Sequence, residues 1–134
     1  MNASVRLLVI EDDRTVSVWL TTLFRRFGFS VHLAEDGLAG LTMARQLRPD
    51  LIILDDNLPK ADGGFVLTTL RKDAASVEMG IIMLSGEQDL DTDALLEAGA
   101  DAFLPKNTEG IALLNTVRTV LENRGSFRRT GTWG

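Results

Sequence analysis

Apolar residues in this chain gather in five short runs, and the longer stretches between the runs have helical periodicity. The runs predict strands at Val5–Ile10, Ser30–Ala34, Asp50–Leu54, Gly80–Leu84 and Ala102–Pro105. Three of them are nearly continuous in apolar residues, as is typical of parallel strands buried on both faces. Alternating strands and helices with right-handed crossovers indicate a single α/β domain, a doubly wound (βα)5 fold whose parallel sheet is covered by helices on both sides.

Local signals place the five helices between and after these strands. The first begins after the N-cap Asp13 and stops at Gly28, and the second begins after Asp36 and closes before Pro49. The third is expected from Gly63 to about Lys72, and the fourth from roughly Asp91 to Ala98. The inward faces are expected to be Val16, Trp19, Leu20, Leu23, Phe24 and Phe27 in the first helix, Leu38, Leu41, Ala44 and Leu47 in the second, Phe65, Val66 and Leu70 in the third, and Ile111, Leu114, Val117 and Leu121 in the fifth.

Composition restricts the classes of function. A length of 134 residues predicts one domain, at residues 1–122, and residues 123–134 are basic and predict a flexible tail or the stub of a linker. The net charge of −5 disfavours direct nucleic-acid binding, and the absence of cysteine excludes thiolate metal sites. Acidic residues begin at Glu11, so the N-terminal stretch is too short for the apolar region of a signal peptide. No apolar stretch reaches membrane-spanning length. We therefore expect a cytoplasmic protein without membrane contact.

Chemically informative residues stand at the ends of four of the five strands. Glu11-Asp12-Asp13 follow the first strand, Asp55-Asp56-Asn57 the third, Ser85-Gly86 the fourth and Lys106 the fifth. The carboxyl ends of parallel strands meet at one edge of the sheet, where ligands bind in open α/β folds. Carboxylates from two strands suit a hard cation such as Mg²⁺, although Asp13 also suits a helix cap. A hydroxyl, a glycine and a lysine suit an oxyanion such as a phosphoryl group.

The order and spacing of these residues resemble a known family. Asp55-x-x-Leu58-Pro59-x-x-Asp62-Gly63 is followed by Ser85 after 30 residues and by Lys106 after 21 more. This set, over residues 5–122, resembles the receiver domain of two-component response regulators, in particular stand-alone receivers of the chemotaxis type. The resemblance implies a flavodoxin-like sheet with strand order 2-1-3-4-5.

The resemblance also implies roles for individual residues. Asp55 corresponds to the phosphoacceptor, with Lys106 and Ser85 as its catalytic partners. Gly86 and Asp56 lie in the phosphoryl-binding part of the site. Asp56 is also a rival acceptor, disfavoured because strand alternation points it away from Asp55.

Metal binding, switching and signal lifetime complete the implied roles. A Mg²⁺ cofactor would be held by Glu11 (directly or through water), Asp12, Asp55 and the carbonyl of Asn57. Ser85 and Phe103 correspond to the family's switch pair. Asn57 and Glu87 occupy the positions that tune hydrolysis, and their polar types predict a phosphoryl lifetime of about minutes.

Two positions depart from the family pattern. Asp56 stands where the family usually has an apolar residue, which adds a negative charge beside the phosphoacceptor. Asn107 stands where proline commonly follows the lysine, often with a cis bond. Because a cis bond before a non-proline residue costs about 3–4 kcal/mol, we expect a trans bond here, with a rearranged loop.

The function implied is that of a phosphorylation-dependent receiver. The phosphoryl group would come from a sensor histidine kinase or a phosphotransfer protein. A downstream protein would read the change on the face of helix four, strand five and helix five, near Leu90, Asp101, Phe103 and Arg118. We expect a monomer or a phosphorylation-dependent weak dimer. Catalysis would be limited to the chain's own phosphorylation and dephosphorylation.

Alternative functions remain open at this level. The chain could be a fragment of a larger regulator or of a hybrid kinase, or a pseudo-receiver that binds partners without phosphorylation. A Mg²⁺-dependent aspartyl phosphatase is less favoured, because its general acid would fall at Asn57. A flavodoxin-like FMN carrier is disfavoured, because the acids after the first strand would repel its phosphate.

Overall fold

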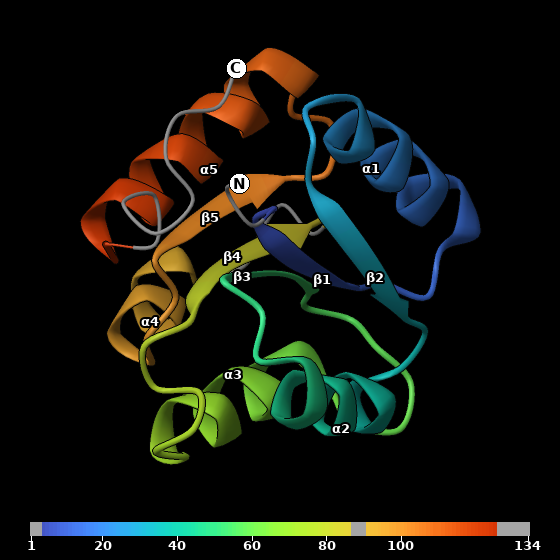
Figure 1. Cartoon of the computed structure of the whole chain (residues 1–134). Helices are drawn as coiled ribbons and strands as arrows, with labels where there is room; N and C mark the ends of the chain where they lie inside the picture. The colour runs from blue at the N-terminus through green and yellow to red at the C-terminus, as the bar shows by residue number, and fades with distance from the viewer. Residues whose placement is uncertain (1–3, 87–90, 126–134) are drawn as a thin grey trace.

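The computed structural model describes residues 4–86 and 91–125. Strands and helices alternate in it along the chain (Figure 1). The strands form one parallel sheet in the order β2-β1-β3-β4-β5, which confirms the expected flavodoxin-like topology. The elements are β1 Arg6–Ile10, α1 Arg14–Arg26, β2 Ser30–Ala34, α2 Gly37–Leu47, β3 Leu51–Asp55, α3 Gly63–Lys72, β4 Gly80–Ser85, α4 Thr92–Glu97, β5 Ala102–Pro105 and α5 Gly110–Asn123.

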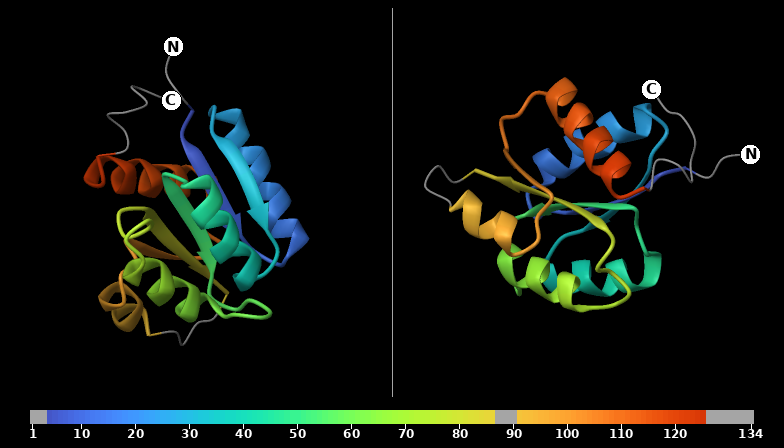
Figure 2. Two further views of the ribbon diagram at one scale, coloured as in Figure 1. Left: turned by 60° about the horizontal axis from the view of Figure 1, so that its bottom comes forward. Right: turned by 90° about the vertical axis from the view of Figure 1, so that its left-hand side faces the viewer.

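Helices cover both faces of the sheet (Figure 2). Alternate residues of β1 divide between the two resulting cores, as the period of a strand requires. Leu7 and Val9 join the core under α1 and α5, whereas Leu8 and Ile10 join the core under α2 and α3. Every residue of β3 and β4 is buried. These two strands are therefore held from both sides, and the loops that leave them start from fixed points.

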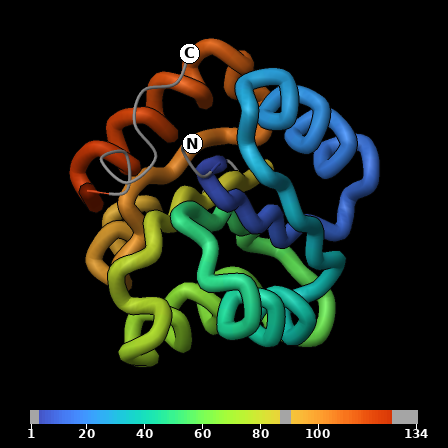
Figure 3. The backbone as a smooth tube through the Cα atoms, viewed as in Figure 1, coloured from blue at the N-terminus to red at the C-terminus, as the bar shows by residue number. Residues whose placement is uncertain are grey.

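Register brings the carboxyl ends of the central strands level with one another. Ile10 pairs with Leu54, Asp55 pairs with Leu84, and Ser85 pairs with Pro105. β3 and β4 each end one residue later than predicted, and β3 also begins one residue later, so Asp55 and Ser85 belong to the ends of their strands. The backbone trace shows how each helix returns the chain to begin the next parallel strand (Figure 3).

Aspartates cap four of the helices, as local sequence signals predicted for the first two. Asp13 accepts a hydrogen bond from the Thr15 N–H at 2.9 Å, and Asp36 accepts one from Ala39 at 2.8 Å. Asp62 and Asp91 cap α3 and α4 in the same way. Gly28 follows the end of α1 with φ of +86°, a conformation that glycine adopts without strain.

Several apolar residues predicted to face the core are exposed instead. Trp19, Phe27, Leu38, Phe65 and Ile111 have exposed fractions of 38, 37, 51, 55 and 65%. These predictions were wrong because a helix lying on a sheet buries only a limited stripe, and periodicity does not fix where its margin falls. Leu67, Leu113 and Val120 fill the core in α3 and α5.

Candidate phosphoryl and metal site

Three acids meet where β1 and β3 end. Glu11, Asp12 and Asp55 each offer a carboxylate oxygen, and these oxygens lie within 4.8 Å of one another. Glu11 and Asp55 are buried, whereas Asp12 is exposed to solvent. The parallel register of β1 and β3 produces this convergence, because it places the two strand ends side by side. The acids predicted as metal ligands are therefore brought together.

Lys106 supplies a positive charge to the two buried acids. Its Nζ lies 3.0 Å from Glu11 Oε1 and 3.2 Å from Asp55 Oδ2. The Lys106 N–H donates to the Ser85 carbonyl at 2.9 Å, which fixes the start of the loop after β5. The structure contains no cis peptide bond in its described residues, in agreement with the trans bond expected before Asn107. The departure at Asn107 leaves the reach of the lysine intact.

One lysine does not balance this cluster, and the pKa values reflect the excess of acid. Burial, followed by the neighbouring Glu11 carboxyl, raises the pKa of Asp55 to about 8. The Asn57 N–H and the charge of Lys106 act in the opposite direction. Burial works against the charge on Lys106, but Glu11 and Asp55 outweigh it and raise the pKa of the amine. The site thus favours any additional positive charge.

The loop between β3 and α3 is held close to the end of β3. The Gly63 N–H donates to the Asp56 carbonyl at 3.1 Å, and the Asn57 N–H donates to Asp55 Oδ1 at 3.2 Å. A Cβ atom on Gly63 would come within 2.3 Å of the Asp55 carbonyl oxygen, so only glycine allows this approach. The Asp62-Gly63 pair of the motif therefore has a steric role. It anchors the loop that presents Asp55.

Ser85 and Asp56 are joined by a contact that sequence reasoning missed. The Ser85 hydroxyl donates to Asp56 Oδ2 at 2.8 Å, from the end of β4 to the residue after β3. Sequence alone offered no signal for it, because the two residues are 29 positions apart. Phe103 is half-buried against the core under α2 and α3. Glu87 and Leu90 lie outside the described residues.

A cavity of about 310 Å³ opens over the acids. Of the residues assigned to the site, Gly86 and Asn57 line it beside the charged side chains. Ser85 is absent from the described lining, since its hydroxyl is turned to Asp56. The lining residues are Asp12, Asp13, Asp55, Asp56, Asn57, Gly86 and Lys106. An open, acid-rich cavity with one lysine suits a small ionic group with a cation.

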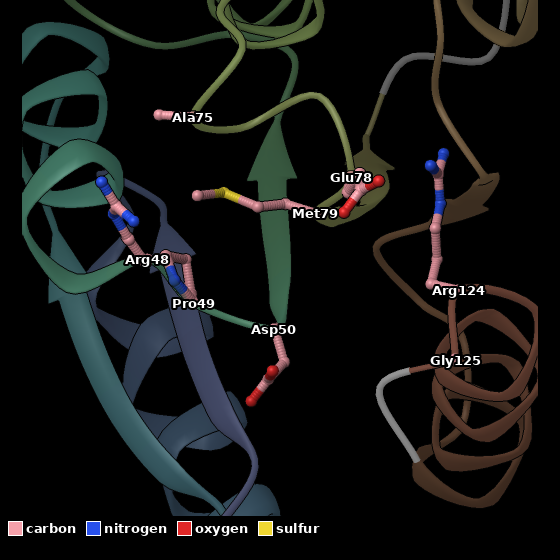
Figure 4. Close-up of a pocket in the computed structure, with 8 residues that line it drawn as sticks. All are labelled: Arg48, Pro49, Asp50, Ala75, Glu78, Met79, Arg124 and Gly125. Atoms are coloured by element: carbon pink, nitrogen blue, oxygen red, sulfur yellow. The ribbon is translucent and has the colours of Figure 1, made fainter. Parts of the chain in front are cut away.

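A second cavity of about 310 Å³ lies away from this chemistry, where β3 begins and α5 ends (Figure 4). Two basic side chains, Arg48 and Arg124, stand on opposite sides of it. Two acidic residues, Asp50 and Glu78, also line it. Its charges are nearly balanced, and Arg124 is already bound to Asp101 at 2.6 Å. The excess of acidic over basic side chains is therefore at the first cavity, which contains Asp55 and Lys106.

Comparison with protein families decides the classification. The family model described as the response regulator receiver domain matches residues 7–118. This chain is a member of that family. The match covers β1 through most of α5 and includes the acids, Ser85 and Lys106.

Relatives of this receiver domain include a longer regulator. The transcriptional regulatory protein PrrA of Mycobacterium tuberculosis is 40% identical over 124 residues, which is 92% of this chain and 52% of the relative. The chain thus spans about half the length of this curated relative.

Solved structures have the same fold. A putative response regulator from Chloroflexus aurantiacus is 30% identical, with a TM-score of 0.85 over 90% of this chain and 99% of that one. The receiver domain of the sensor histidine kinase PA1611 from Pseudomonas aeruginosa, described with a magnesium ion in its active-site cleft, is 24% identical. It has a TM-score of 0.82 over 90% of this chain and 99% of that one, which is a similarity of fold. In the described part of this receiver domain, no helix is long and apolar enough to cross a membrane.

Proposed function

We propose that Asp55 of this receiver domain accepts a phosphoryl group from the phosphohistidine of a partner kinase or phosphotransfer protein. The observation that supports it best is the placement of Asp55. It is buried at the end of β3, 3.2 Å from Lys106 and within 4.8 Å of the Glu11 and Asp12 oxygens, beneath an open cavity. A carboxylate so placed is fixed as a nucleophile and has positive charge at hand for the incoming oxygens.

The transfer is a displacement at phosphorus. Asp55 first loses its proton to solvent, and a carboxylate oxygen then forms the new O–P bond while the P–N bond of the phosphohistidine breaks. The electron pair of that bond stays on the imidazole nitrogen, which gains a proton from solvent. Lys106 neutralises charge on the transferred oxygens, and Gly86, which lines the cavity, is proposed to donate its backbone N–H to one of them. Water attacking phosphorus later releases inorganic phosphate and restores Asp55.

The donor set fits Mg²⁺. The oxygens of Glu11, Asp12 and Asp55 lie within 4.8 Å of one another, and carboxylate oxygens are ligands that Mg²⁺ prefers. The Asn57 carbonyl is proposed as a further ligand. When bound, Mg²⁺ would offset the excess acid charge and stabilise the transferred phosphoryl oxygens.

We propose that a partner protein reads the phosphorylation state of this domain by direct contact. The face formed by α4, β5 and α5 includes Phe103, and Arg118 is exposed on α5. Phe103 packs at the margin of a core, so it can respond to a movement of Ser85 on the neighbouring strand. PrrA is named as a transcriptional regulator, and the match with this chain covers 52% of its length.

Signal lifetime is proposed to be short. Asn57 is exposed and lines the cavity over Asp55, where a polar amide leaves a route for water. The partner position in this proposal, Glu87, lies outside the described residues. We expect phospho-Asp55 to decay within about minutes, and phosphate release from the purified phosphoprotein measures the rate.

The central test is intact mass after incubation with acetyl phosphate and Mg²⁺. Wild type should gain the mass of one phosphoryl group, and Asp55→Asn should gain none. Asp62→Asn is the matched control, because it removes an acid from the same loop while asparagine still caps α3. The control should be labelled like wild type. Full labelling of Asp55→Asn would refute Asp55 as the acceptor.

A further inference from the structure

Asp56 is the residue at which this chain departs from the usual pattern of its family beside the phosphoacceptor. Its backbone is held on both sides, since its N–H donates to the Leu84 carbonyl at 3.4 Å and its carbonyl accepts from Gly63 at 3.1 Å. This frame presents the Asp56 carboxylate to the end of β4. Asp56 is outside the cluster of acids whose oxygens converge on a cation site in the described residues. Its observed side-chain contact is with Ser85.

The hydroxyl of Ser85 has one proton to donate. In this structure the proton goes to Asp56 Oδ2 at 2.8 Å, which is the usual length of an O–H···O hydrogen bond. Ser85 is only 1% exposed, so water cannot readily replace the carboxylate. A hydroxyl that donates to Asp56 cannot donate to a phosphoryl oxygen on Asp55 at the same time. The two acceptors therefore compete for one donor.

We propose that Asp56 is a positioning residue that holds the Ser85 hydroxyl out of the phosphoryl site until Asp55 is phosphorylated. The proposal rests on the phosphoacceptor function proposed above. The phosphoryl group must win the hydroxyl from Asp56 before Ser85 can move. Part of the free energy of phosphoryl binding is therefore used to break the hydrogen bond between Ser85 and Asp56. The strength of that bond determines how large this part is.

Beryllium trifluoride, a stable mimic of the phosphoryl group on an aspartate, tests this proposal. Its apparent dissociation constant in the presence of Mg²⁺ is measured by calorimetry for wild type, Asp56→Asn and Asp56→Leu. Asparagine and leucine are similar in size, and both remove the negative charge. Asparagine retains an oxygen acceptor for Ser85, whereas leucine retains none. The comparison of Asn with Leu therefore isolates the hydrogen bond from the charge.

We expect Asp56→Leu to bind the mimic about fivefold more tightly than Asp56→Asn, from the net value of a neutral hydrogen bond. In a Ser85→Ala background, which lacks the donor, the two variants should bind equally. Equal binding of the two variants with Ser85 present would overturn the proposal. So would a difference that persists without Ser85. Melting temperatures without the mimic establish that each variant is folded.

The same titration separates this proposal from the function on which it rests. If wild type binds no beryllium trifluoride, or if Asp55→Asn binds it equally well, the phosphoacceptor assignment fails. If wild type binds it through Asp55 but asparagine and leucine at position 56 are equivalent, only the role of Asp56 fails.

Discussion

Charged side chains gather at both ends of the sheet, and the two groups are built differently. At the amino end of β4, Asp101 accepts hydrogen bonds from Arg71 at 3.0 Å, from the Ile81 N–H at 2.8 Å and from Arg124 at 2.6 Å. Two guanidinium groups there serve one carboxylate. Arg71 also donates to the Gly99 carbonyl at 2.8 Å, which ties α3 to the segment before β5.

The carboxyl end of the sheet has the opposite balance. Within residues 4–86 and 91–125, Lys106 is the basic side chain that pairs with Glu11 and Asp55, and Asp12 lies close to both acids. Burial, followed by the neighbouring Glu11 carboxyl, raises the pKa of Asp55 to about 8. A network whose polar groups are all hydrogen-bonded stabilises the fold. A cluster with excess negative charge favours the binding of a cation. This difference agrees with a structural role for the amino end and with the ligand site proposed at the carboxyl end.

Breaking the network at the amino end should cause the largest loss of stability. Arg71→Ala removes a half-buried guanidinium that serves three carbonyls and Asp101, and we expect a loss of about 3 kcal/mol in the free energy of unfolding. Arg45→Ala is the control, because its pair with Asp73 is exposed and should contribute less than about 1 kcal/mol. Urea denaturation measures both. Equal losses would contradict a structural role for the network.

Removing a charge at the carboxyl end should have the opposite sign. Without metal, Asp55→Asn should be more stable than wild type by about 2 kcal/mol at pH 8, because it removes a carboxylate that is costly to ionise. The folded pKa lies above the unfolded value of about 3.9. The stabilising contribution of protonated Asp55 is therefore complete below about pH 4 and is lost as the pH rises through about 8.

A pH series of denaturation curves checks this sign. The advantage of Asp55→Asn over wild type should grow between about pH 4 and pH 8. Asp62→Asn, an exposed cap, should show no such growth. If the advantage is constant with pH, or if Asp55→Asn is less stable than wild type, the surroundings of Asp55 do not raise its pKa.

Added Mg²⁺ should act on one end of the sheet only. At a free concentration ten times the dissociation constant, a ligand of the folded state adds about 1.4 kcal/mol of stability. We expect this gain in wild type and also in Arg71→Ala, where the acid cluster is intact. Asp12→Ala should lose most of it. Thermal melts with and without Mg²⁺ measure the gain, and an undiminished gain in Asp12→Ala would remove Asp12 from the proposed ligands.

Much of this molecule follows from local sequence. Runs such as 51–54 must be buried, and the polar residues after them must lie at the strand ends, because parallel strands all point the same way. The caps Asp13 and Asp36 act within a few residues of their own position. The sheet, its order by resemblance, and the meeting of Glu11, Asp12, Asp55 and Lys106 were therefore predictable before any coordinates.

Other features depended on the tertiary structure. Helical periodicity could not place the margin of a buried face, so Trp19 and Ile111 were wrongly assigned to the core. The bonds of Asp101 to Arg71 and Arg124 join residues far apart in sequence, and the same is true of the bond between Ser85 and Asp56. A sequence determines which side chains a strand end presents. Which of those side chains hydrogen-bond to each other depends on distances that only the packed sheet and its loops define.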